Sequence, residues 1–144
     1  MGDPIVDMAT FAQRSRDAGF QPKMGVGAAN LNGVNSALAD LLPLLGQELT
    51  TLGVPLMITS GVDDAPDRNP QSRHNPAIGG AIDVGIKGPN GYLTNEQQIE
   101  LMGTLRGKFG KRFQFQNEKD HFHIEQALED QAVQDLLRNI GGGQ

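Results

Sequence analysis

GAIDVGI at residues 80–86 and HFHIEQ at residues 121–126 decide the fold, because apolar and polar residues alternate in both stretches. Side chains alternate between the two faces of a β-strand, so each stretch predicts a strand with one apolar face. Ile82 and Val84 then share the apolar face, while Asp83 and His123 lie on the opposite one. A sheet that is apolar behind and carries histidines and an aspartate in front predicts a functional site.

Two further strands extend this pattern outward. Residues 55–62, PLMITSGV, read as one strand, and residues 112–116 would pair with 121–126 around a turn near Asn117-Glu118. The apolar side chains of all four strands would share one face: Leu56, Ile58, Ile82, Val84, Ile86, Phe113, Phe115, Phe122 and Ile124. The opposite face would receive Ala81, Asp83, Gly85, His121, His123 and Glu125.

Helices are predicted before, between and after these strands. Thr94 and Gln97 form a capping-box pattern at the start of one of them, and Pro43 should kink or split another. Residues 20–33 read as a loop. The expected helices cover residues 3–19, 34–52, 94–109 and 130–140. The sequence therefore predicts an α+β fold, with a small, mainly antiparallel sheet, helices packed on one face and the site on the other.

The composition indicates a single folded domain and argues against nucleic-acid binding and cysteine chemistry. The chain has 144 residues, of which 38% are hydrophobic, and this suits a single domain over residues 1–144. The formal net charge is -5 and no dense Lys/Arg run occurs, so nucleic acid is not an expected partner. Cysteine is absent, which excludes disulfides, thiolate-bound zinc and a thiol nucleophile.

Three residues form a candidate mononuclear zinc site: His74, Asp83 and His123. Without cysteine, zinc takes nitrogen and oxygen ligands, and a catalytic site has three protein ligands with one position open for water. Ala81 and Gly85 flank Asp83 and leave room for a metal and a substrate. The alternative is that His74 is an ordinary loop histidine and that His121 and His123 are exposed strand residues.

The motifs ITSG at 58–61, SRH at 72–74, GGAID at 79–83 and DHFH at 120–123 resemble a family of zinc peptidases. This family contains D-alanyl-D-alanine carboxypeptidases and L-alanyl-D-glutamate endopeptidases, and it shares its core with lysostaphin-type peptidases and the zinc domain of hedgehog. The resemblance covers about residues 55–126. It implies a zinc peptidase that hydrolyses a peptide bond in bacterial peptidoglycan, with the stem peptide as its partner.

The resemblance also implies individual roles. His74, Asp83 and His123 match the three zinc ligands in order, Ser72 matches the serine two residues before the first ligand, and Asp120 matches the acidic general base. His121 matches the first histidine of the paired-histidine motif in the wider group.

The motifs depart from the family in two places. The gap from His74 to Gly79 is two residues longer than usual, and Val62-Asp63 stand where the family has an aromatic residue and an arginine that holds substrate charge. Arg68 and Arg73 are the candidate substitutes for that arginine, and with Ser72 they form the predicted substrate-binding set.

Asp120 and His121 compete for the role of general base. In a regular strand His121 and His123 face one side and Asp120 the other, which favours His121. An irregular backbone at the preceding turn would favour Asp120. We expect Asp120 to take the proton from the attacking water and pass it to the leaving amine. His121 would then stabilise the developing oxyanion or position the substrate.

The N-terminal residues MGDPIVDMATF lack the basic start and continuous apolar run of a signal peptide. No stretch approaches the roughly 20 apolar residues of a membrane span. Release by lysis or carriage on a virion would bring such a protein to the cell wall, although the location itself stays open. An acidic chain gains no long-range attraction to an anionic envelope, so a delivery partner is expected.

Three functions follow from these patterns. The first is a phage-associated peptidoglycan peptidase, such as a lysin or a virion component. The second is an inactive, zinc-stabilised module of a larger assembly such as a phage tail, which the Val62-Asp63 departure favours. The third is a structural protein without metal. The sequence leaves open which peptidoglycan bond would be cut.

Overall fold

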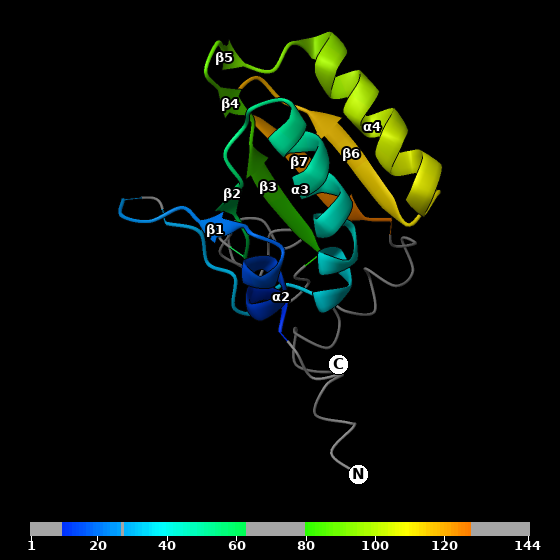
Figure 1. The fold of residues 1–144 in the computed structure, drawn as a ribbon. Coiled ribbons are helices and arrows are strands. Elements are labelled where there is room, and N and C mark those ends of the chain that lie inside the picture. The colour runs from blue at the N-terminus through cyan, green and yellow to red at the C-terminus, as the bar shows by residue number, and fades with distance from the viewer. Residues whose placement is uncertain (1–9, 27, 63–79, 128–144) are drawn as a thin grey trace.

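A five-stranded sheet lies at the centre of the computed structural model, which describes residues 10–26, 28–62 and 80–127 (Figure 1). The strands β1 and β2 run parallel, and every other neighbouring pair is antiparallel. The predicted α+β fold with a mainly antiparallel sheet is therefore confirmed. The order across the sheet is β1 (Gln21–Pro22), β2 (Met57–Ser60), β3 (Ala81–Gly85), β7 (His121–Gln126) and β6 (Phe113–Asn117).

Pro43 divides the predicted helix over residues 34–52. The apolar stripe there forms a 3-10 helix, η1 (Ser36–Leu41), followed by the α-helix α3 (Leu42–Thr51). Pro43 occupies the first turn of α3, where its missing N–H group has no intrahelical partner to lose. The expected split is thus confirmed, and the reason is that a proline begins a helix more readily than it continues one.

Side-chain caps fix the starts of two other helices. Thr94 and Gln97 form the predicted capping box at the start of α4 (Asn95–Phe109). A second capping box, which was not predicted, joins Thr10 to Gln13 at the start of α2 (Phe11–Asp17). Thr10 has extended backbone angles, so a continuous helix over residues 3–19 is wrong at this point.

Two pairings lie outside the predicted strands. The strand β1 falls within residues 20–33, which were predicted to be a loop, and its backbone bonds to the segment entering β2. A small hairpin, β4 (Lys87–Gly88) and β5 (Gly91–Tyr92), follows β3. Both pairings are too short to produce a period-two pattern. The predicted helix over residues 130–140 lies outside the described part of the chain.

The hydrophobic core lies between the sheet and the helices. Figure 1 shows α3 crossing in front of β3 and β7, with α4 beside β6. The predicted apolar face of the sheet is confirmed, because its members join leucines of η1 and α3 in one buried cluster, with Leu56 at its margin. The buried members from the sheet are Ile58, Ile82, Val84, Phe113, Phe115, Phe122 and Ile124.

A shift in the pairing register of β2 with β3 places Ser60 opposite Asp83. Ile58 pairs with Val84, but the next pair is Ser60 with Asp83, so Thr59 is an extra residue in β2. At the end of this strand, the N–H of Val62 donates to the carbonyl oxygen of Asn30. None of the helices within the described residues is long and apolar enough to cross a lipid bilayer.

Candidate functional site

Asp83 and His123 meet directly on the polar face of the sheet. They are opposite each other in the antiparallel pairing of β3 with β7, so their side chains project from the same face. Asp83 Oδ1 lies 2.8 Å from His123 Nδ1. The side chains are 14% and 15% exposed, respectively. The shared face predicted from strand alternation is therefore confirmed, and the pairing register brings the two side chains into contact.

Glu125 occupies the other side of the His123 ring. Its Oε1 lies 2.9 Å from His123 Nε2, so each ring nitrogen of His123 faces a carboxylate oxygen. Burial alone would lower the pKa of His123, but the hydrogen bonds and negative charges of Asp83 and Glu125 outweigh it and raise this pKa to about 9. In the metal-free protein at neutral pH, His123 is therefore an imidazolium that donates to both carboxylates.

His121 extends the arrangement toward the start of β7. Its Nε2 lies 3.6 Å from Asp83 Oδ2, which is an ion-pair distance rather than a hydrogen bond. Its Nδ1 lies 2.8 Å from Asp120 Oδ1. We refer to the five residues Asp120, His121, Asp83, His123 and Glu125 as the carboxylate–imidazole chain, because carboxylates and imidazoles alternate along it.

The geometry at Asp120 brings the two candidate bases together. Asp120 lies in a bend before β7 rather than inside the strand, so strand alternation does not direct its side chain to the opposite face. The side chain is 64% exposed. The hydrogen bond from His121 holds the pKa of Asp120 below its usual range, so Asp120 is ionised at neutral pH. Asp120 and His121 therefore form a pair open to solvent at one end of the chain.

Glu125 and Ser60 are not among the site residues predicted from the sequence. Glu125 was expected on the polar face, but its contact with His123 was not anticipated. A signal was available, because residues two apart in a strand share a face. Ser60 stands beside Asp83 only because of the irregular pairing after Ile58, and no sequence pattern indicates that shift.

Four predicted site residues lie outside the described part of the chain. They are the zinc ligand His74 and the substrate-binding residues Arg68, Ser72 and Arg73. Within residues 10–26, 28–62 and 80–127, no group of three or more histidine, aspartate or glutamate side chains is arranged to hold a metal ion. The structure thus brings together two of the three predicted ligands, Asp83 and His123.

Val62 stands where the family that the motifs resemble carries an aromatic residue, and it belongs to the core. It is 3% exposed and packs with the apolar residues behind the sheet. Val62 is consequently unavailable to a ligand on the polar face. Its neighbour Asp63 lies beyond the described residues.

Comparison with known proteins identifies no relative: no protein-family model, curated protein or solved structure matches this chain.

Proposed function

We propose that this protein is a zinc-dependent peptidase that hydrolyses a peptide bond in bacterial peptidoglycan. The observation that carries the proposal is the 2.8 Å contact between Asp83 and His123 from two different strands. An imidazole and a carboxylate held this close, with little exposure, are two donors of the kind that zinc accepts in cysteine-free sites. His74 is the proposed third ligand.

The surroundings of His123 suit a metal ligand. A zinc-binding histidine commonly donates its second ring N–H group to a carboxylate, which fixes the ring orientation. Glu125 is in position to accept that bond from Nε2, which leaves Nδ1 on the side of Asp83. Zinc binding at Asp83 and His123 would replace the proton between them. A Zn²⁺ ion lowers the pKa of a bound water to about 7, which supplies hydroxide at neutral pH.

Asp120 and His121 are the proposed catalytic residues. An ionised, solvent-open carboxylate can accept a proton from the attacking water and transfer it to the leaving amine. The Nδ1 atom of His121 contacts Asp120, and the Nε2 atom of His121 faces Asp83. His121 therefore connects the proposed base to the centre of the carboxylate–imidazole chain. We assign His121 to substrate positioning and oxyanion stabilisation.

The second candidate is a non-catalytic module of a larger assembly, such as a phage tail. The Val62-Asp63 departure favours it, because Val62 is buried in the core and an aspartate stands where the resembled family has the arginine that holds substrate charge. In this case the carboxylate–imidazole chain would stabilise the sheet, with or without zinc. The proposed delivery partner of the peptidase is a component of a virion or lysis system, whereas the module would be part of the assembly itself.

Elemental analysis and a hydrolysis assay separate these functions. The purified chain should bind one zinc ion, and zinc should increase the release of amino groups from purified peptidoglycan. Mass spectrometry of the digested muropeptides would identify the bond. Asp83→Ala and His123→Ala should lose zinc and activity together, whereas Glu100→Gln, on the exposed surface of α4, should lose neither.

Asp120→Ala tests the assignment of the base. This variant should retain zinc and lose turnover, because Asp120 contacts His121 rather than Asp83 or His123. Full activity of Asp120→Ala would assign the base elsewhere. A zinc-loaded wild-type chain that releases no amino groups would support the binding module, and a chain without zinc would support the metal-free structural protein.

A further inference from the structure

A groove of about 480 Å³ lies beside the carboxylate–imidazole chain, within the usual range of roughly 300–1,000 Å³ for ligand pockets. Its walls come from parts of the chain that are distant in sequence: the loop after β1, strands β2 and β3, the β4–β5 hairpin and the bend before β7. The residues that matter for its chemistry are Lys23, Met57, Gly85, Lys87, Tyr92 and Asp120.

The groove is continuous with the proposed site. Gly85 lines it and stands opposite His121 in the pairing of β3 with β7. Asp120 also lines it and contacts His121. Gly85 leaves this end open, because it presents no side chain next to Thr59. A ligand lying in the groove would therefore reach the carboxylate–imidazole chain at its solvent-open end.

The groove combines cationic groups with exposed apolar surface. Met57 and Tyr92 are 39% and 48% exposed, although both are large apolar side chains in a concave region. Lys87 Nζ lies 5.7 Å from the centre of the Tyr92 ring, and Lys23 enters from the loop after β1. These ammonium groups stand out in a chain whose net charge is -5. Their charge complements an anion attached to an apolar body.

We propose that Lys23 and Lys87 bind a carboxylate of the peptide substrate, while Met57 and Tyr92 contact its aliphatic part. The proposal rests on the proposed peptidase function, and it adds a specificity determinant outside the zinc-peptidase motifs. It predicts a substrate whose anionic group lies to one side of the scissile bond. In a stem peptide that carboxylate belongs either to the C-terminus or to the D-glutamyl residue.

Calorimetric binding of synthetic peptides tests this directly. The probe is L-Ala-γ-D-Glu-L-Lys-D-Ala-D-Ala, compared with a C-terminal amide and with a D-isoglutamine form. Titrations use the full chain carrying Asp120→Ala to prevent turnover. One of the two neutralised peptides should bind about tenfold more weakly, because it loses a charge-assisted contact, and this identifies the carboxylate. Equal affinity for all three peptides would overturn the proposal.

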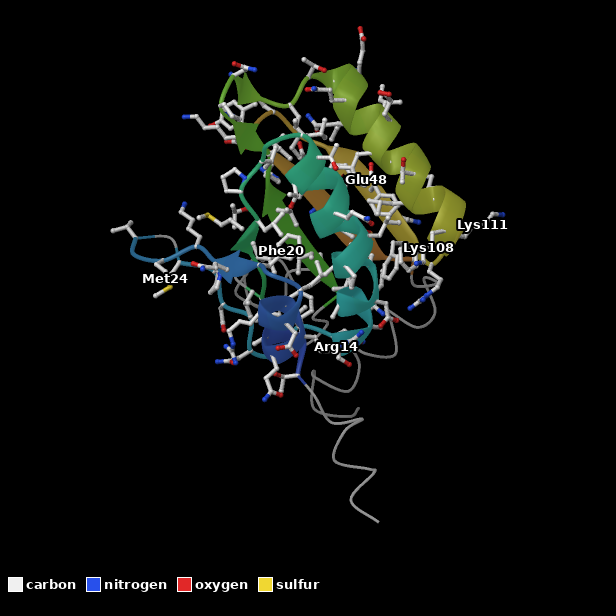
Figure 2. The ribbon with its side chains drawn as sticks, viewed as in Figure 1. Arg14, Phe20, Met24, Glu48, Lys108 and Lys111 are labelled. Carbon is white, nitrogen blue, oxygen red and sulfur yellow. The ribbon has the colours of Figure 1, made fainter. Side chains whose placement is uncertain are left out.

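The lysines are tested in the same background. Lys23→Gln and Lys87→Gln together should weaken binding of the acidic peptide about tenfold and abolish its advantage over the neutral form. The matched control is Lys111→Gln, at the C-terminal end of α4 and on the opposite side of the view from Met24 of the groove (Figure 2). It should change neither affinity. If the double lysine variant still favours the acidic peptide, the proposal is wrong.

Hydrolysis separates this inference from the proposed function. Zinc-dependent release of amino groups with an unchanged KM in the double lysine variant would preserve the peptidase and reject the groove. Charge-dependent binding by a wild-type chain that releases no amino groups would support the groove and make the protein a peptide-binding module.

Discussion

Removing the charge of Asp83 should destabilise the metal-free protein by an amount that depends on pH. In Asp83→Asn the side chain keeps its shape, but His123 loses the negative charge of Asp83 and keeps that of Glu125. His123 has a pKa of about 9, compared with about 6.5 in model compounds. At about 1.4 kcal/mol per unit, this shift favours the imidazolium by a net of about 3 kcal/mol, after the opposing effect of burial.

The two hydrogen bonds to His123 have similar lengths, 2.8 Å to Asp83 and 2.9 Å to Glu125. If each carboxylate contributes comparably, removing the charge of Asp83 costs about 1–2 kcal/mol after solvent screening. Because the folded-state pKa is raised, the stabilisation is fully present below pH about 6.5. It is lost as the pH rises through about 9.

Urea unfolding in the presence of a chelator measures the effect. The free energy of unfolding of Asp83→Asn should lie about 1–2 kcal/mol below that of the wild type at pH 6, and the gap should shrink by pH 10. Glu100→Gln, an acid-to-amide change on the exposed surface of α4, should show no such gap. A difference that is equal at both pH values would refute an imidazolium–carboxylate interaction at Asp83.

Three further results are expected. Gly61→Ala should unfold the protein or cost more than about 2 kcal/mol in urea unfolding, because a Cβ atom would lie 2.2 Å from the backbone oxygen of Asn30. Gln98→Ala should cost about 1–3 kcal/mol and speed hydrogen exchange in the turn before β7, because Gln98 is 3% exposed and donates to the carbonyl oxygen of Glu118. Zinc binding at pH 7 should release a proton from His123, seen as a dependence of the calorimetric enthalpy on buffer; a buffer-independent enthalpy would contradict this.

Sequence periodicity was sufficient for most of the sheet. Alternation assigned Ile82 and Val84 to the core and Asp83 and His123 to the opposite face, because strand geometry fixes side-chain parity within a single segment. Local rules also placed the start of α4 at Thr94 and the helix division at Pro43. Each of these features depends only on residues a few positions apart.

Longer-range features were not predictable in this way. The parallel pairing of β1 and the extra residue in β2 both depend on which segment packs alongside. The groove is the clearest example, since Lys23 and Asp120 are distant in sequence yet both line it. No local pattern specifies that proximity.

The sequence alone therefore determined the α+β class, the apolar face of the sheet and the shared face of Asp83 and His123. Only the tertiary structure decided that these two residues lie directly opposite each other, that Glu125 and Asp120 complete the carboxylate–imidazole chain, and that two lysines flank its open end. The physical reason is that parity is set within one strand, whereas register and proximity are set by hydrogen bonding and packing between segments.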